Sequence, residues 1–387
     1  MSVGRLRISG IFLFITGILV ACNIYTLIPL YGAIGSEMGI PGQQVANGST
    51  FFTLFYAFGL LIFGPVSDQV GRKKIIVGGL IFSALTTFLV VLANVPIELF
   101  LYRGLQGFTL ASFAPVTFLY VFELFSGKER TMWLALINTG FLMAGILGQL
   151  ASSSMLAIGT WHSVYILFSF LYILLFLLNS VILPKTKVQS STTHPTDILR
   201  GMVTVLKNRE MQMMYMIVFS ILFAFVSFYE AWGYQSSGES NMMMLRGIGL
   251  FGAILSVFTG IFIERFGAVN TLFVGIILGW GSIFILMFVH DEGFLSLISV
   301  FFVSSIALLI PTIIHLIGGK SGILRGKALS LYSFILLLGA SFGSFMASLL
   351  SYKAMLTMIL GFFTLDLLLA YQIGRKEKSL RIKQEFS

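Results

Sequence analysis

Residues 64–74 read GPVSDQVGRKK, and residues 260–267 read GIFIERFG. Each stretch has a glycine, an acid four residues later and a second glycine three residues after the acid, and the two copies begin 196 residues apart. The same offset relates Pro115 to Pro311, in a chain that contains only eight prolines. It also relates one row of small residues to another: Ala144, Gly148 and Ser152 to Ala340, Ser344 and Ser348. A repeat of about half the chain length predicts two homologous halves.

The composition places these halves in a membrane. Hydrophobic residues make up 57% of the chain and charged residues 10%, whereas a soluble domain carries about 25% charged residues. A helix needs about 20 apolar residues to cross the hydrocarbon core, and the apolar runs reach that length without the alternation typical of barrel strands. We predict an all-α membrane protein with twelve transmembrane helices in two pseudo-symmetric six-helix bundles, at residues 8–32, 47–67, 74–94, 97–121, 132–157, 162–184, 211–234, 244–263, 268–289, 294–316, 328–350 and 354–374.

The connection at 185–210 is the one long polar segment between the apolar runs, with five basic residues and a Ser/Thr stretch at 190–193. It divides the chain into four predicted parts: an N-terminal bundle at 1–184, a cytoplasmic linker at 185–210, a C-terminal bundle at 211–374 and a cytoplasmic tail at 375–387. A lipoprotein signal ending at Cys22 is an alternative interpretation of the N-terminus. The apolar run continues to Leu30, however, which favours a first transmembrane helix.

The basic residues indicate the orientation. With the N-terminus inside, nearly all Lys and Arg residues fall at cytoplasmic ends of the predicted helices, and the exceptions are Arg103, Arg246 and Lys353. This asymmetry predicts cytoplasmic N- and C-termini. The net charge of +9 is therefore an orientation signal, and the basic residues form no folded patch of the kind that binds nucleic acid.

The repeated stretches resemble a known family. Residues 64–74 resemble the signature of the major facilitator superfamily, G-x-x-x-D-R-x-G-R-R/K-R/K, between helices 2 and 3, and residues 260–267 resemble its second-half echo. Residues 103–107, RGLQG, resemble the second family motif, R-x-x-Q-G, in helix 4. The resemblance covers essentially the whole chain and is strongest to the drug:proton antiporter branch, and within it to small bacterial exporters. It therefore implies a location in the bacterial inner membrane. It also implies a transporter that exposes a central site alternately to the two sides of the membrane.

The chemistry of the first motif explains its residue types. Gly64 allows a close helix approach and Gly71 a tight reversal into the next helix. Asp68 can pair with Arg72 or lie at the N-terminal end of another helix, which the resemblance implies is helix 11. Such a contact would form in only one of two transport states. We therefore expect a gating role for both motif copies: Gly64, Asp68, Gly71, Arg72, Gly260, Glu264, Arg265 and Gly267.

Few ionisable residues lie within the predicted helices, and such residues are costly enough to be functional candidates. Arg103 and Gln106 share one helix face, and Glu230 in helix 7 could exchange protons and pair with Arg103 across the two halves. The alternatives are a packing arginine at 103 and a solvated helix end at 230. Asp366 we interpret first as a packing or helix-contact residue. The predicted substrate and proton-coupling residues are Asn23, Tyr25, Arg103, Gln106, Tyr229, Glu230 and Trp232.

The chain departs from the antiporter branch at two places. Residues 140–149 read GFLMAGILGQ, which keeps glycines but lacks the Gly-Pro kink of the helix 5 motif, and helix 1 offers Asn23 and Tyr25 where many exporters of cationic drugs have an acid. A neutral, zwitterionic or anionic cargo therefore fits better than a lipophilic cation, and Arg103 suits an anionic group.

Other chemistry finds no support in the sequence. Cys22 is the single cysteine, the four histidines lack metal-ligand spacing, and Ile314 occupies the first glycine position of a phosphate-binding loop before Gly319. We predict neither an enzyme nor a cofactor or metal site, and we expect a monomer.

We therefore predict a secondary active transporter that exports a small organic compound in exchange for protons. The alternatives are a dedicated metabolite or metallophore exporter, a nutrient uptake symporter of the same fold, and a transporter-like sensor. Two intact gating motifs argue against the sensor, because a protein that only binds its ligand need not keep them.

Overall fold

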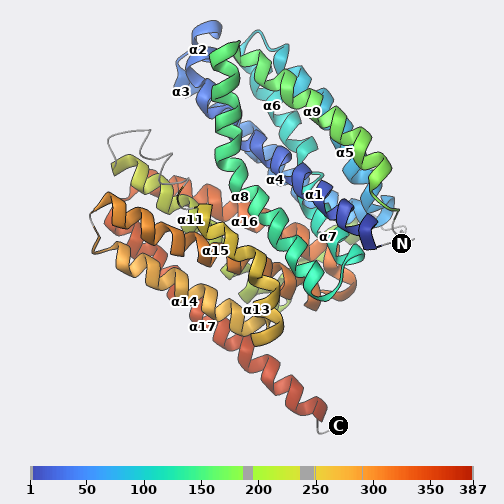
Figure 1. Ribbon diagram of the computed structural model, residues 1–387, viewed down its shortest axis with the longest axis vertical. Coiled ribbons are helices and arrows are strands. Elements are labelled where there is room, and N and C mark those ends of the chain that lie inside the picture. Colours follow the sequence, from blue (N-terminus) through green and yellow to red (C-terminus); the bar gives the residue numbers. More distant parts are fainter. Residues whose placement is uncertain (1–2, 186–194, 236–247, 249, 290, 386–387) are drawn as a thin grey trace. The chain divides into compact units, whose positions relative to one another are not determined.

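The computed structural model describes residues 3–185, 195–235, 248, 250–289 and 291–385, and every regular element among them is a helix (Figure 1). Eleven helical segments of this described part are long and apolar enough to cross a membrane. The predicted eighth crossing, 244–263, lies partly outside the described residues, and its described part is helical. The all-α prediction is confirmed, and a twelve-helix architecture agrees with it.

Four of the six helices predicted up to residue 184 have bounds within five residues of the prediction. The helices in this part of the chain are α1 Val3–Tyr25, η1 Ile28–Leu30, α2 Tyr31–Met38, α3 Gly42–Val45, α4 Asn47–Val70, α5 Arg72–Val91, α6 Pro96–Leu110, α7 Ala114–Leu124, α8 Gly127–Ile158 and α9 Trp161–Ile182. The later helices are α10 Pro195–Lys207, α11 Arg209–Gln235, η2 Leu250–Phe258, α13 Thr259–Phe266, α14 Ala268–Leu286, α15 Glu292–Lys320, η3 Gly322–Leu324, α16 Arg325–Leu349 and α17 Tyr352–Glu385.

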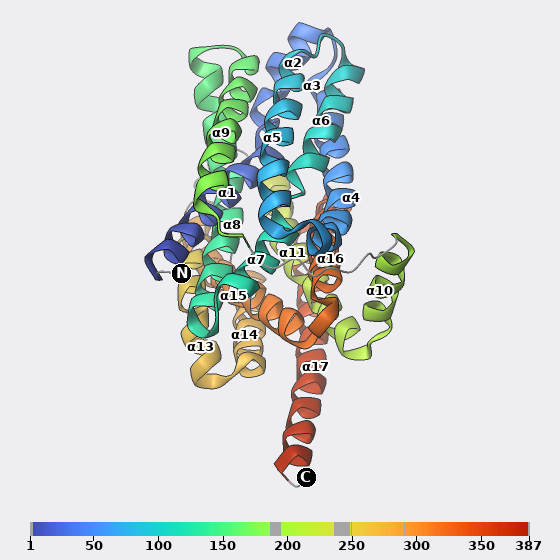
Figure 2. The ribbon, with the colours of Figure 1, turned by 90° about the vertical axis from the view of Figure 1, so that its right-hand side faces the viewer.

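The chain forms two compact units. Unit 1 comprises Met1–Phe125, Gly140–Ile198 and Leu329–Phe334, and unit 2 comprises Ser126–Thr139, Leu199–Ala328 and Ile335–Ser387. In unit 1, α5 lies beside α9 and α6, and α4 lies beside α6 (Figure 2). In unit 2, α17 lies between α11 and α14. The predicted division at 184 and 211 stays a prediction.

Two predicted helices are interrupted. The predicted helix 97–121 is divided into α6 and α7 at residues 111–113, directly before Pro115, which cannot donate a helix hydrogen bond. The equivalent Pro311 lies inside the continuous α15, so the two halves of the repeat differ here. The predicted helix 8–32 ends as an α-helix at Tyr25, ahead of Pro29, and continues as η1 and α2.

The two glycine turns of the repeat have the same backbone geometry. Gly71 has φ 101° and ψ 138°, and Gly267 has φ 83° and ψ 154°, a region that residues with a side chain rarely adopt. The Gly71 amide donates to Ser67 O, and the Gly267 amide donates to Ile263 O. These bonds again lie 196 residues apart. The sequence repeat is therefore also a repeat of local structure.

Glycines also allow the closest helix contacts within each unit. A Cβ atom on Gly107 would lie 2.2 Å from the carbonyl oxygen of Phe52, which brings α6 against α4. In unit 2, a Cβ atom on Gly339 would lie 2.2 Å from the Phe219 carbonyl oxygen, which brings α16 against α11. Without an aqueous hydrophobic effect between helices in lipid, such close backbone packing carries much of the association energy.

The linker contains a helix that the sequence analysis did not predict. α10 occupies residues 195–207, with Leu199 and Val203 exposed on one face and Met202 and Val205 buried on another. Residues 186–194 of the predicted linker, including its whole Ser/Thr stretch at 190–193, lie outside the described residues.

We predict that Gly107→Ala destabilises unit 1. The added methyl group must displace the Phe52 backbone, and overpacking of this kind costs about 1–3 kcal/mol. The measurement is the thermal unfolding midpoint of the purified protein in detergent. Gly78→Ala in α5 is the matched control, because a Cβ atom there meets nothing within 4 Å. Equal midpoints for the two variants would contradict the close α4–α6 contact.

Candidate functional site

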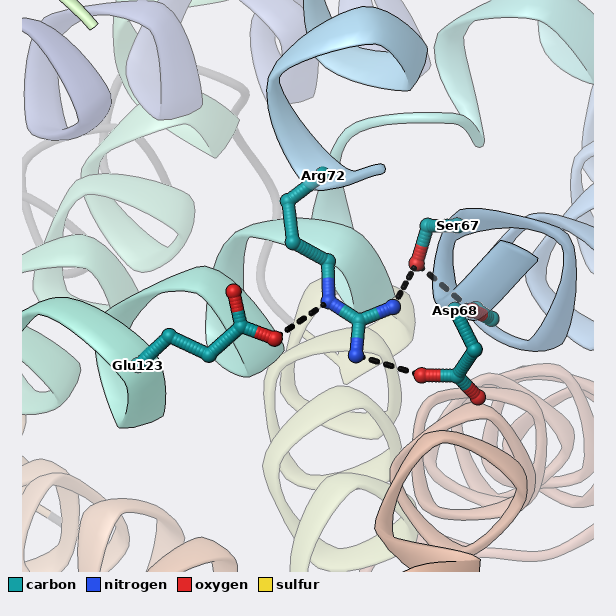
Figure 3. Close-up of polar contacts among 5 residues, drawn as sticks. Ser67, Asp68, Arg72 and Glu123 are labelled. Atoms are coloured by element: carbon teal, nitrogen blue, oxygen red, sulfur yellow. Dashed lines mark hydrogen bonds and ion pairs between the residues drawn. The ribbon is translucent and has the colours of Figure 1, made fainter. Parts of the chain in front are cut away.

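The first motif copy builds a charged cluster at the turn between α4 and α5 (Figure 3). The Arg72 guanidinium forms an ion pair with Asp68, donates from Nε to Glu123 Oε1 at 3.0 Å, and donates from Nη1 to Ser67 Oγ at 2.7 Å. Ser67 in turn donates to the Gly64 carbonyl at 2.6 Å. Arg72 therefore joins the end of α4 to the end of α7 through two carboxylates and one hydroxyl.

The second motif copy makes a simpler contact in unit 2. Glu264, at the end of α13, pairs with Lys128 at the start of α8, with 2.7 Å between Nζ and Oε2. A Cβ atom on Gly260 would lie 3.3 Å from the Lys128 carbonyl oxygen, so the glycine admits the same α8 segment. The guanidinium of Arg265 lies 5.6 Å from the Phe266 ring centre. The predicted gating residues thus form local contacts in both copies.

A second polar cluster lies inside unit 1 and centres on Arg103, which is 0% exposed. Its Nη1 donates to Gln106 Oε1 at 2.5 Å, and its Nη2 donates to the carbonyl oxygen of Asn23 at 3.0 Å. Gln106 extends the network to two further side chains, because its Nε2 donates to Asn23 Oδ1 at 2.8 Å and to Thr87 Oγ1 at 2.9 Å. This network connects α6 to α1 and α5.

Arg103 forms no ion pair among the described residues. Its positive charge instead meets the last turn of α1, where carbonyl oxygens carry the negative end of the helix dipole. The Phe52 ring centre lies 4.4 Å and the Tyr165 ring centre 5.8 Å from the guanidinium carbon, both suited to cation–π contact. The Nε atom is buried without a hydrogen-bond partner. The cluster therefore retains a positive charge and a free donor.

The α9 helix completes the cluster. Asn23 donates from Nδ2 to the Tyr172 hydroxyl, and that hydroxyl donates to the Leu19 carbonyl at 2.9 Å. Tyr172 is fully buried, as are Asn23 and Gln106. Because each amide of the cluster has a partner on another helix, the side chains are held in one arrangement.

The remaining predicted site residues are spread over both units. Tyr25 is half-buried, with its ring 3.7 Å from a Cβ position on Gly145. In unit 2, Tyr229 is buried against Phe228, Trp232 stacks edge-on with Tyr352 at 5.3 Å, and Glu230 is half-buried. Arg103 and Glu230 belong to different units, so their pairing stays a prediction. The structure brings together Asn23, Arg103 and Gln106.

Several members of these clusters were not predicted from the sequence: Ser67, Thr87, Glu123, Lys128, Tyr165 and Tyr172. Ser67 lies within the first motif itself, and each of the others lies on a different helix from the residue it contacts. Glu123 carried a usable signal, because an acid at the end of an apolar run is a natural partner for basic residues at the same membrane face. Tyr172 carried none, since it is one of thirteen tyrosines.

Comparison with known proteins agrees with these motifs. The model of the Major Facilitator Superfamily matches residues 13–343. The chain belongs to this superfamily. Its proteins and the relatives below are transporters, so this chain is a multi-pass membrane transporter and not an enzyme.

The relatives include a drug-resistance protein and multidrug transporters. An uncharacterised transporter of Buchnera aphidicola (subsp. Schizaphis graminum) is 26% identical over 76% of this chain and 73% of its own length. The chloramphenicol resistance protein CraA of Acinetobacter baumannii is 30% identical over 44% of this chain and 41% of its own length. The multidrug transporter MdfA of Edwardsiella piscicida is 29% identical over 46% of this chain and 43% of its own length.

The fold has a close likeness among solved structures. The crystal structure of the human organic anion transporter MFSD10 superposes with a TM-score of 0.75 at 18% identity, over 94% of this chain and 99% of the other. At this identity the likeness supports the fold alone.

We predict that Arg103→Lys destabilises unit 1. A lysine keeps the charge but lacks the fork that reaches Gln106 and Asn23 together, and loss of such a bond costs about 1.5–3 kcal/mol. The expected result is a lower thermal unfolding midpoint in detergent. Arg5→Lys, at an exposed position, is the control. An unchanged midpoint for Arg103→Lys would show that the forked contact contributes nothing.

Proposed function

We propose that this transporter exports a small organic compound across a bacterial inner membrane in exchange for protons, by alternating access of a central site. The observation that carries the proposal is the pair of motif contacts, Asp68–Arg72–Glu123 in unit 1 and Glu264–Lys128 in unit 2, to which we assign the gating role. Family membership supports transport, and the drug-resistance and multidrug-transporter relatives support export.

The proposed orientation has both termini in the cytoplasm. The turn after α4 carries Lys73 and Lys74, and Lys185 lines the same hollow of about 350 Å³. Basic residues favour the cytoplasmic face, which supports placing the Asp68 end of unit 1 there. In this orientation, both motif contacts form at the cytoplasmic end of their helices.

The charges of the Asp68–Arg72–Glu123 cluster favour a gating role over a purely structural one. Arg72 has a side chain that is 9% exposed and is held by two carboxylates, so one carboxylate still compensates its charge when the other contact breaks. Asp68 is therefore able to leave Arg72 with Glu123 when the cytoplasmic end opens. An exchange of this kind never leaves the buried Arg72 charge uncompensated.

The proposed coupling step uses Arg103 and Glu230. An ionised Glu230 would compensate the positive charge that the ring faces and the end of α1 leave on Arg103, and a protonated Glu230 would release that charge to the cargo. The free Nε donor of Arg103 suits an anionic or strongly polar group. The cargo class that fits is a neutral, zwitterionic or anionic compound. We propose that the transporter works as a monomer.

We predict that chloramphenicol, the compound in the name of one relative, dissipates a respiration-driven pH gradient in everted vesicles that contain the protein. Glu230→Gln cannot release a proton and should abolish the response. Glu98→Gln is the matched control. Glu98 lies in the first turn of α6 and accepts a hydrogen bond from the backbone N–H of Asn94, and glutamine retains that acceptor.

Two outcomes would count against the proposal. A full response in Glu230→Gln would remove Glu230 from the coupling step. No wild-type response to chloramphenicol or to any compound of an antibiotic panel would contradict drug export and favour a dedicated metabolite exporter or nutrient uptake.

We predict that Asp68→Asn slows efflux several-fold without unfolding the protein. The amide cannot pair with the Arg72 charge, so the cytoplasmic end loses one of its closing contacts. The measurement is the efflux rate of a compound active in the vesicle assay, with expression and unfolding midpoint checked in parallel. Asp291→Asn is the control, because asparagine caps α15 as well as aspartate does. Wild-type efflux by Asp68→Asn would contradict the gate.

A further inference from the structure

A further ionisable site lies in unit 2 and shares no residue with the clusters described above. Asp366 lies in the middle of α17 and is 1% exposed. Its Oδ2 atom hydrogen-bonds with the Ser220 hydroxyl of α11, and its Oδ1 atom is buried without a partner. Asp366 forms no ion pair among the described residues.

The hydrogen bonds of Ser220 indicate the state of this carboxyl group. The Ser220 Oγ atom lies 2.9 Å from the Ile217 carbonyl oxygen and also contacts Asp366 Oδ2. A serine hydroxyl has one proton, so it can donate to only one of these two oxygens. If Asp366 is ionised, two acceptors compete for that proton. If Oδ2 carries a proton, Asp366 donates to Ser220, Ser220 donates to Ile217, and both contacts are satisfied.

The surroundings favour the neutral form as well. Phe219 and Phe223 of α11 pack against Phe362 of α17, with ring centres 6.0 and 4.8 Å apart. An unpartnered oxygen in such a setting costs far less on a neutral carboxyl group than on a carboxylate. Phe223 is three residues from Ser220 and Phe362 is four from Asp366, so the aromatic contact lies about one helical turn from the bond between α11 and α17.

Charged groups on the neighbouring helices lie too far along their axes to replace the proton. α14, which packs against α17, contains no ionisable residue. On α11, Glu210 and Glu230 are each ten residues from Ser220, about 15 Å along the helix. Tyr215 of α11 is five residues from Ser220, and its hydroxyl donates to the Ala328 carbonyl at 2.9 Å.

The same holds for the remaining helices around the site. Phe302 of α15 packs its ring against Phe363 of α17, close in sequence to Asp366. The ionisable residues of α15 are ten or more positions from Phe302: Glu292, His315 and Lys320. Phe342 of α16 packs its ring against Phe219 of α11 and lies fifteen residues beyond Lys327. On α17 itself, the nearest charged described residues are Lys353 and Arg375, and Arg375 is nine positions from Asp366.

A hollow lies between α11 and α17 in unit 2. Its volume is about 440 Å³, and its lining includes Gln212, Phe219, Phe362 and Leu365. Phe219 directly precedes Ser220 in sequence, and Leu365 directly precedes Asp366, but neither bonded residue lines the hollow. The hollow therefore lies beside the helix segments that carry the bond and does not expose it.

We propose that Asp366 is a second proton-binding residue, which holds a proton in this conformation and exchanges it during transport. On release, the Asp366 Oδ2–H bond breaks and the proton passes to water, while the Ser220 hydroxyl turns from Ile217 to donate to the new carboxylate. The role of Asp366 in transport rests on the proposed proton coupling. The proposal that Asp366 carries a proton in this conformation is independent of that coupling, because it is argued from the contacts of Ser220.

Infrared difference spectroscopy of the reconstituted protein tests the proton directly and needs no substrate. At neutral pH, the wild type should show a C=O stretching band of a buried, protonated carboxylic acid, and alkaline buffer should remove it. Asp366→Asn should lack the band, and Asp291→Asn, at an exposed helix cap, should retain it. Ser220→Ala should shift its frequency, because the acceptor of the Asp366 proton is lost.

Each of the following results would contradict one part of the proposal. A wild-type spectrum without the band would show an ionised Asp366. A band that persists in alkaline buffer as long as the protein stays folded would show a permanent proton and a purely structural residue. The wild-type titration and Ser220→Ala carry the test even if Asp366→Asn does not fold. If the band titrates while everted vesicles show no proton exchange, the proposed function fails and the proton site stands.

Discussion

The membrane penalises every charge that is left without compensation, and the described ionisable side chains within the helices meet this constraint in three ways. Arg72, at the boundary, is held by two carboxylates. Arg103, inside unit 1, is held by the end of α1 and by aromatic ring faces. Asp366, inside unit 2, bonds with a serine hydroxyl. Only the first is an ordinary ion pair, and the other two leave a charge or a proton that a transport cycle can use.

Glycine determines how closely the helices that carry these groups can approach. The positive φ angles of Gly71 and Gly267 reverse the chain directly after the acids of the motif, so Asp68 and Glu264 lie at the same position relative to the next helix. Gly107 lets α6 approach α4, and Phe52 of α4 is one of the rings over Arg103. The backbone contacts and the charge clusters are therefore parts of one arrangement in unit 1.

Much of the fold was predictable from the sequence. Apolar runs of sufficient length predicted the helices, and the repeated glycine and acid positions predicted the two turns, because both signals are local. The break at residues 111–113 was missed, since a proline in an apolar run is compatible with either a kink or a new helix, as Pro115 and Pro311 illustrate.

The candidate site was less predictable. Arg103 and Gln106 were identified by their cost in a membrane, and Asn23 by its place in helix 1. Thr87 and Tyr172 were not, because their role depends on which distant helices meet α6. Asp366 was interpreted as a packing or helix-contact residue, and its bond with Ser220 of α11 is such a contact and also makes it a candidate proton site.

Spin-label distances provide the most direct test of proton-coupled alternating access. One label pair at Lys74 and Arg265 reports the predicted cytoplasmic end, and a second at Val95 and Lys353 reports the predicted outer end, all of them exposed positions. Cys22 is buried and is the only native cysteine, so it interferes little with labelling. We expect a change of pH to lengthen one distance distribution and shorten the other. Distances that stay constant, or that change in the same direction at both ends, would contradict the mechanism.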